Sequence, residues 1–258
     1  MDRREFIKKS GMEVMAAAVS PLLASPLGKI IEETRTNTGM KKIMIIDGGP
    51  RKNMNTAAMV EKFAEGAREA GAEVKIVRLY DIDYKGCRSC MACQLKGKRV
   101  DSCRFKDGLT DILAECAAAD GLVLASPIYY GEVTAQLRAF YERLSFPWLN
   151  YKTGSFKASK QMPVTMIYTM NASPEQYDMM KATLSPMPMY LSMALGCEVE
   201  TIMANCTKQV KDYSRYEFSD ATAQAHDKWH EEHFAEELQR AFEAGKRMAE
   251  DALRVANV

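Results

Sequence analysis

Short apolar runs alternate with helix-length segments from about residue 40 onward. The run at 42–46 (KIMII) opens into a loop, and a segment that starts near Asn55 then repeats its apolar positions at helical spacing until Gly71. A continuous apolar run is typical of a buried parallel strand, whereas a 3.6-residue repeat indicates a helix packed by one face. We therefore predict a strand, a loop and a helix, with Asn55 or Thr56 as the helix cap.

The same alternation continues to the end of the chain. Strands that alternate with helices form right-handed crossovers and a parallel sheet covered on both faces. The pattern thus predicts an α/β fold with five parallel strands. The further segments expected to be strands are 72–82, 121–131, 161–170 and 197–205, and those expected to be helices are 107–119, 134–144 and most of the last fifty residues.

Composition narrows the choice of function. The 258 residues contain 35 Lys and Arg against 34 Asp and Glu, and no basic face with interleaved aromatic residues is visible. This balance argues against a nucleic-acid partner and favours small-molecule chemistry. We expect no stable membrane span, because no later stretch is apolar for about 20 residues.

The first 39 residues differ from the rest. They begin MDRREFIKKSG, with paired Arg3 and Arg4, continue with an apolar, Ala-rich stretch at 15–27, and end in the linker EETRTNTG. This order resembles a twin-arginine export signal, which predicts a periplasmic protein. The alternative is an amphipathic N-terminal extension of a cytoplasmic protein. We expect residues 1–39 to be signal and linker and residues 40–258 to be one domain.

The loop after the first strand is a candidate anion site. A helix N-terminus offers backbone amides and a favourable dipole, and this loop adds polar side chains and a guanidinium. It lacks both the GK[ST] ending of a nucleotide triphosphate loop and the G-x-G-x-x-G pattern, so one phosphate monoester fits it best. The alternative is an ordinary Gly-Pro turn with a helix cap. The candidate residues are Gly49, Pro50, Arg51, Asn53, Asn55 and Thr56.

A second candidate site follows the third strand, at the same sheet edge. Open parallel sheets bind ligands at the carboxyl ends of their strands, and a loop with two tyrosines could cover a flat heterocycle. The alternative is that the tyrosines serve packing alone. The candidate residues are Pro127, Ile128, Tyr129, Tyr130 and Gly131.

Four of the seven cysteines lie in one stretch, 86–104, spaced C-x-x-C-x-x-C and then nine residues to the last. Three thiols from one turning loop and a fourth from a distance suit an iron-sulfur cluster. Zinc, disulfides and unligated thiols remain alternatives, although zinc more often uses two separated C-x-x-C pairs. The candidate ligands are Cys87, Cys90, Cys93 and Cys103, while Cys116, Cys197 and Cys206 are interpreted as small buried apolar residues.

Two further clusters have a structural and a functional interpretation. His226, His230 and His233 share one helix face, where they could ligate zinc or belong to a solvated face. The Met-rich run at 179–196 could line a substrate pocket or a dimer contact, or it could be core.

Three segments occur in a characteristic order along the chain: GGPRKNMNT after the first strand, then the cysteine loop, then ADGLVLASPIYYGEVTAQLRAFYERL. Together they resemble the flavodoxin-like NAD(P)H-dependent FMN reductase superfamily, and most closely its iron-sulfur flavoprotein branch, over about 41–205. The resemblance implies a flavodoxin-like three-layer αβα sandwich with strand order 2-1-3-4-5. It implies FMN, with its phosphate in the 49–56 loop and its ring against 127–131, and a [4Fe-4S] cluster on the four cysteines. Gly49 replaces the usual serine, and TMNAS replaces the usual glycines after strand four.

The implied function is an FMN-dependent oxidoreductase that transfers electrons between NAD(P)H or another reduced donor and an unknown small-molecule or protein acceptor. FMN exchanges electron pairs or single electrons and a cluster exchanges single electrons, so no catalytic side chain is required. The resemblance also implies a homodimer or higher homo-oligomer. The alternatives are a cluster-free NAD(P)H-dependent quinone or FMN reductase and a non-catalytic electron carrier.

Overall fold

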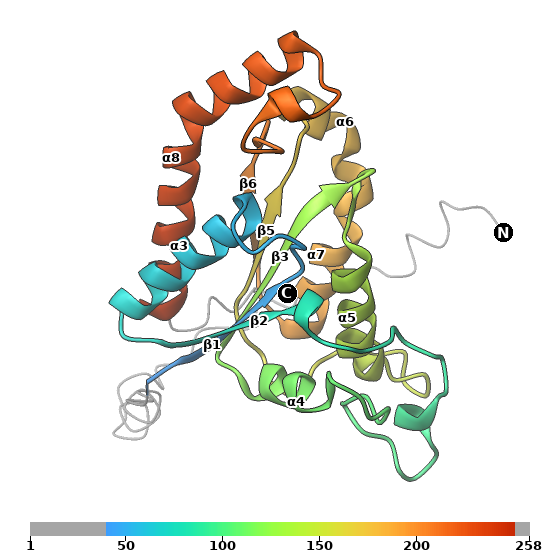
Figure 1. Cartoon of the computed structure of the whole chain (residues 1–258). Helices are drawn as coiled ribbons and strands as arrows, with labels where there is room; N and C mark the ends of the chain where they lie inside the picture. Colours follow the sequence, from blue (N-terminus) through green and yellow to red (C-terminus); the bar gives the residue numbers. More distant parts are fainter. Residues whose placement is uncertain (1–39, 251–258) are drawn as a thin grey trace, which may run out of the picture. The chain divides into compact units, whose positions relative to one another are not determined.

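The structure, a computed structural model, describes residues 40–250 and places their strands in one sheet (Figure 1). The strands are β1 (Lys42–Asp47), β2 (Glu73–Arg78), β3 (Gly121–Tyr129), β4 (Glu132–Val133), β5 (Val164–Thr169) and β6 (Val199–Ala204). Five of them are parallel in the order β2-β1-β3-β5-β6, and β4 pairs antiparallel with the end of β3. Because β4 is only a two-residue addition, the predicted order 2-1-3-4-5 is confirmed. The predicted export signal lies outside the described residues.

The apolar run of β1 is continuous because both faces of the sheet are covered. Ile43 and Ile45 pack into the core on one face, and Met44 and Ile46 into the core on the other. All four side chains are fully buried. Since successive strand residues point to opposite faces, a strand buried on both sides needs an apolar residue at every position.

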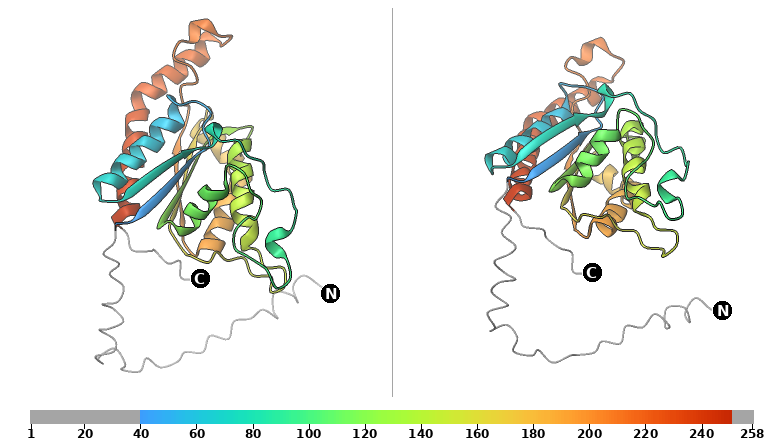
Figure 2. Two further views of the ribbon diagram at one scale, coloured as in Figure 1. Left: turned by 60° about the horizontal axis from the view of Figure 1, so that its bottom comes forward. Right: turned by 90° about the horizontal axis from the view of Figure 1, so that it is seen from below.

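The helices lie in two layers (Figures 1 and 2). Helices α3 and α8 pack on one core, and α4 to α7 pack on the other. The first half of α8 runs beyond the sheet, toward the segment that follows β6 (Figure 1). The helices are α3 (Asn55–Glu69), α4 (Thr110–Ala118), α5 (Ala135–Ser145), α6 (Pro174–Leu184), α7 (Pro186–Leu195) and α8 (Asp220–Glu250).

Helices α3 and α8 meet backbone to backbone. A Cβ added at Gly66 would lie 1.9 Å from the carbonyl oxygen of Phe242, and one added at Gly245 would lie 2.0 Å from that of Phe63. Both distances are too short for any Cβ atom. The two glycines therefore permit an approach that any other residue would prevent, and they fix α8 against the helix that follows the first loop.

Two details differ from the sequence-based expectation. Neither Asn55 nor Thr56 caps α3: Met54 holds the cap position, without a side-chain hydrogen bond. Helix α4 begins at Thr110 instead of Asp107, whose carboxylate binds other partners. The Met-rich run at 179–196, whose interpretation was left open, lies mostly in α6 and α7 and is buried only in part.

Candidate functional site

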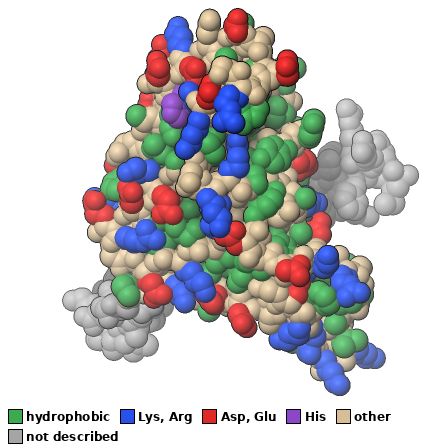
Figure 3. All heavy atoms as spheres, in the orientation of Figure 1, with side chains coloured by type: hydrophobic (Ala, Val, Ile, Leu, Met, Phe, Trp, Pro, Cys, Tyr) green, Lys and Arg blue, Asp and Glu red, His purple; other side chains and the backbone are tan. Residues whose placement is uncertain are grey.

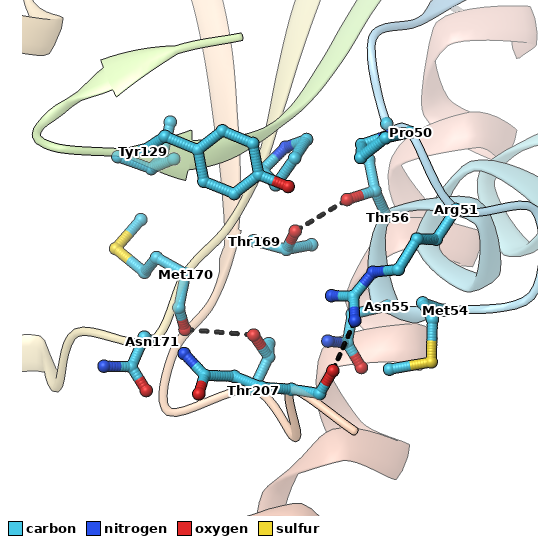
Figure 4. Close-up of a pocket in the computed structure, with 14 residues that line it drawn as sticks. Pro50, Arg51, Met54, Asn55, Thr56, Tyr129, Thr169, Met170, Asn171 and Thr207 are labelled. Atoms are coloured by element: carbon cyan, nitrogen blue, oxygen red, sulfur yellow. Dashed lines mark hydrogen bonds between the residues drawn. The ribbon is translucent and has the colours of Figure 1, made fainter. Parts of the chain in front are cut away.

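A cleft of about 500 Å³, counted with the solvent at its mouth, lies at the carboxyl edge of the sheet, between the loops that follow β1 and β3 (Figure 4). Of the predicted site residues, it is lined by Gly49, Pro50, Arg51, Asn55, Thr56, Pro127, Ile128 and Tyr129. The other lining residues are Met54, Thr169, Met170, Asn171, Thr207 and Gln209. Asn53, Tyr130 and Gly131 do not line it, and Tyr130 is fully exposed at 109%. Their contact with a ligand stays a prediction.

Backbone and hydroxyl groups tie the two loops together. The Thr134 hydroxyl donates to the carbonyl of Gly48 at 2.9 Å and accepts from the amide of Leu137, so it caps α5 and holds the first loop. The Gly48 amide donates to the carbonyl of Ala125 at 2.8 Å, and the Thr134 amide donates to the hydroxyl of Ser126 at 2.9 Å. All these groups lie at the sheet edge, so the cleft is preformed.

A buried carboxylate lies under the first loop. Asp47, which is 0% exposed, accepts the Gly49 amide at 2.7 Å and the Arg78 guanidinium at 2.7 Å. Burial raises the pKa of Asp47, and these two donors oppose the rise. A Cβ at residue 49 would lie 2.9 Å from the Asp47 carboxylate and 3.1 Å from the Cβ of Thr56. Glycine therefore stands at 49 because Asp47 and Thr56 fill the space.

The polar side chains of the first loop reach across the cleft. Arg51 donates to the carbonyl of Gln209 (Figure 4), and Asn55 donates to that of Lys208 at 2.8 Å. Deeper in the cleft, the hydroxyls of Thr56 and Thr169 lie 2.7 Å apart. The donors predicted to bind phosphate thus hold the segment after β6, which forms the far wall of the cleft.

The N-terminal turns of α8 and the short helix Tyr213–Arg215 that precedes it hold that segment in place. His226 Nδ1 lies 2.9 Å from the carbonyl oxygen of Cys206, Lys208 pairs with Asp227, and the Gln209 amide donates to the hydroxyl of Tyr213. The three histidines that were predicted to share a helix face therefore have different partners. His230 and His233 pack against the rings of Phe234 and Trp229, and none of the three belongs to a group arranged for a metal ion within residues 40–250.

The four cysteines of the loop line one pocket of about 340 Å³, counted with the solvent at its mouth. Arg88, Phe105 and Arg143 contribute to its walls. The chain's seven cysteines all lie in the described part, and all are free. The structure places no three His, Cys, Asp or Glu side chains of residues 40–250 around a single ion.

A zinc ion and an iron-sulfur cluster place different geometric demands on four thiols. Four thiolates on one zinc must converge at bonds of about 2.3 Å. The four thiolates of a cubane bind four different irons, so they stand around a cage and need not meet at a point. Four thiols that line one pocket match the second requirement.

The individual thiols differ in environment. Cys93 is buried, which raises its pKa, whereas Cys90 is exposed at the mouth of the pocket. Outside the pocket, burial raises the pKa of Cys116 to about 12 and also raises that of Cys197. Both are buried apolar residues, as predicted, while Cys206 is only partly buried.

Comparison with known proteins decides the family. Residues 41–195 match the model of the NADPH-dependent FMN reductase family. The chain belongs to this family. It is 34% identical over 102 residues to an iron-sulfur flavoprotein of Methanocaldococcus jannaschii and to one of Methanosarcina thermophila, in each case over 40% of this chain and 51% of the relative. The chain thus spans about half the length of these curated relatives, which agree with the branch predicted from the motifs.

Solved structures agree with the flavodoxin-like fold of this FMN reductase family member. An NAD(P)H:quinone oxidoreductase from Methanothermobacter marburgensis matches with a TM-score of 0.58 at 15% identity, over 83% of this chain and all of that one. An azoreductase from Bacillus anthracis has the same TM-score and identity, over 81% of this chain and all of that one.

The family match and the cleft differ in extent. Thr169 and Asn171 lie within the FMN reductase match. Their place at the carboxyl end of the fourth predicted strand was a usable signal, since the carboxyl ends of parallel strands meet at one edge. Thr207 and Gln209 lie beyond it, and nothing in their local sequence marks them as site residues. Only the tertiary structure brings them to the cleft.

Basic side chains surround the cysteine pocket of this FMN reductase relative. The segment 85–106 contains seven Lys and Arg residues but a single acidic residue, Asp101. Lys and Arg side chains gather at the lower right of Figure 3, over this loop.

Within the described residues no helix is long and apolar enough to cross a membrane.

Proposed function

We propose that the chain is an FMN-dependent oxidoreductase that moves electrons between NAD(P)H, or another reduced donor, and a small-molecule or protein acceptor. The observation that carries this proposal is the cleft, where the two predicted loops meet at the sheet edge. The loop at 49–56 would hold the FMN phosphate, and residues 127–129 would lie against the ring. The family match and the flavin-enzyme fold support the assignment.

When bound, FMN would supply the exchange of electron pairs and single electrons. The chain's own residues bind and orient it. Arg51 and Asn55 offer charge-assisted and neutral donors, and both can turn from the backbone carbonyls they now hold toward a phosphate. Thr134 keeps the two loops in register, so little ordering is required on binding.

We also propose that the four-cysteine pocket holds a [4Fe-4S] cluster. The convergence of all four thiols on one pocket supports it, and so do the iron-sulfur flavoproteins among the relatives. The nine-residue spacer is not an obstacle, because it closes on itself: the Val100 amide donates to the carbonyl of Cys93 at 3.1 Å.

Anaerobic purification followed by flavin, iron and sulfide counts tests both assignments. Arg51→Gln should weaken FMN binding by about tenfold or more, as expected for the loss of a donor to a charged group. Lys52→Gln is the matched control, since Lys52 pairs with Asp81 outside the cleft. Equal affinities for the two variants would contradict the phosphate assignment.

Cys90→Ser should lose iron and retain flavin, with Cys206→Ser as the matched control outside the pocket. Flavin without iron in the unmodified protein would favour a cluster-free quinone or FMN reductase. Steady oxidation of NADPH with a small quinone would support an enzyme, whereas reduction only by a partner protein would favour an electron carrier.

Two further proposals concern the whole protein. A twin-arginine route to the periplasm rests on the residues at 1–27, and replacement of Arg3 and Arg4 by Lys should retain the protein in the cytoplasm. A homodimer is supported by exposed apolar side chains on α6 and α7, which sedimentation can test; these are Met179, Met189, Tyr190 and Met193.

A further inference from the structure

Arg143, on the last turn of α5, is the largest fully buried side chain of the described residues, with 1% of its side chain exposed. A buried guanidinium is costly unless its donors are paired. It donates to both oxygens of Asp107 at 2.8 and 3.1 Å, to the carbonyl of Lys85 at 2.8 Å and to that of Phe105 at 2.9 Å. Its Nε has one partner, the Sγ of Cys103, at 2.9 Å.

These partners lie on both sides of the cysteine loop. Lys85 stands two residues before Cys87, while Phe105 and Asp107 follow Cys103. One side chain on a rigid helix therefore joins the beginning and the end of a loop that has little regular structure. Burial alone would raise the pKa of Asp107, but hydrogen bonds from Arg143 and from backbone amides outweigh it and lower the pKa, so the ion pair persists in mild acid.

The Nε contact selects the cysteine that is remote in sequence. Cys87, Cys90 and Cys93 lie within one stretch of seven residues, whereas Cys103 follows only after a further nine-residue spacer. A donor at 2.9 Å from its sulfur fixes where it returns. A guanidinium beside a thiolate also stabilises whichever state of the ligand set carries more negative charge.

We propose that Arg143 is a positioning residue that holds Cys103 as the fourth cluster ligand and raises the reduction potential of the cluster. Hydrogen bonds to ligand sulfurs and local positive charge favour the reduced, more negative state. The inference rests on the proposed cluster, and it adds the residue that selects and tunes the ligand set.

The experiment uses the full-length protein, reconstituted anaerobically with ferrous iron and sulfide. Arg143→Gln should lose several-fold of its iron per chain, and Arg143→Lys should keep more iron but shift the midpoint potential to more negative values, because Lys preserves charge and loses the Nε geometry. Asp107→Asn should shift the potential in the opposite direction, since it removes a negative charge and leaves the Arg143 contact with sulfur available. Shifts of the midpoint potential in opposite directions cannot arise from a loosened cysteine loop alone.

Arg138→Gln is the matched control on the same helix, because Arg138 is exposed and pairs with Glu142. Flavin content and circular dichroism report folding in each variant. Unchanged iron and potential in both Arg143 variants, or shifts of the same sign in Arg143→Lys and Asp107→Asn, would overturn the inference while the cluster assignment stood. If the unmodified chain took up no iron, both would fail together.

Discussion

The cleft and the cysteine pocket lie toward opposite ends of α5, and they are held in different ways. Thr134, at the start of the helix, joins the cleft loops through backbone partners that parallel strands already place side by side. Arg143, at its end, holds a loop with no sheet beneath it. The geometry of the cleft follows from the arrangement of the strands, whereas the geometry of the cysteine pocket depends on the buried Arg143 side chain and its ion pair with Asp107.

This difference predicts where the molecule tolerates change. A site built on strands and helix termini shares the stability of the core, so damage to it appears as loss of the whole domain. A site built on a loop can open locally at a free energy below that of global unfolding. The same type of substitution should therefore act globally in one region and locally in the other.

Gly66→Ala should have the largest effect. Its Cβ would lie 1.9 Å from the Phe242 carbonyl oxygen, so α3 and α8 must separate, at a cost of about 3 kcal/mol or more. Thermal unfolding should show a lower Tm, and FMN retention should fall with it, because α3 follows the phosphate loop. Gly71→Ala is the comparison: the space around it is open, so only the backbone strain of its φ of +86° applies, at about 1 kcal/mol. A Tm close to that of the unmodified protein would show that the helices can part without loss.

Gly49→Ser should destabilise by about 1–3 kcal/mol through overpacking. The added Cβ would press on the Asp47 carboxylate, which Arg78 holds in place. Combining it with Asp47→Ala should cost less than the sum of the two single changes in urea unfolding. Additive costs would mean that Asp47 does not dictate the glycine.

Gly97→Ala, in the cysteine loop, should cost about 1 kcal/mol, because φ is +72° and the space around it is open. The change should appear as faster hydrogen exchange between Cys93 and Cys103, with a Tm near that of the unmodified protein. A global loss of stability as large as that of Gly66→Ala would contradict the distinction between the two regions.

The smallest expected effect is the dependence of the cysteine loop's local stability on acidic pH. The pKa of Asp107 lies below its ordinary value of 3.8, so its ion pair contributes stability that is present above 3.8 and is lost as the pH falls through the lowered value. The protection factors of the cysteine-loop amides, which correct for the intrinsic pH dependence of hydrogen exchange, should therefore stay high at pH 5 and fall only below 3.8. Asp107→Asn should remove this acid dependence, and an equal dependence in that variant would assign it to another group.

The sequence predicted the parallel sheet and most of the cleft because both depend on local patterns. Apolar runs such as KIMII report burial on both faces, and the carboxyl ends of β1 and β3 must meet at one edge. Spacing likewise indicated the four thiols that share a pocket. The cap of α3 was predicted wrongly, because Asn55 and Thr56 use their side chains on Lys208 and Thr169, which no local pattern shows.

Long-range partners explain what else the sequence could not indicate. Arg143 is one of two arginines in its helical segment, and only the tertiary structure shows that it is buried against Cys103. Gly66 and Gly245 are 179 positions apart, so the sequence does not show that both lie at the contact between α3 and α8. The export signal stays a prediction.

The far wall of the cleft lies outside the part of the chain by which the family is recognised. Thr207 and Gln209 follow the matched residues 41–195, and the start of α8 keeps their segment in place. A fragment cut at residue 195 to obtain a minimal flavin module would leave Arg51 and Asn55 facing water. Anyone who transplants this module should carry the whole C-terminal helix with it, since similarity marks a shorter unit than the one that physically encloses a ligand.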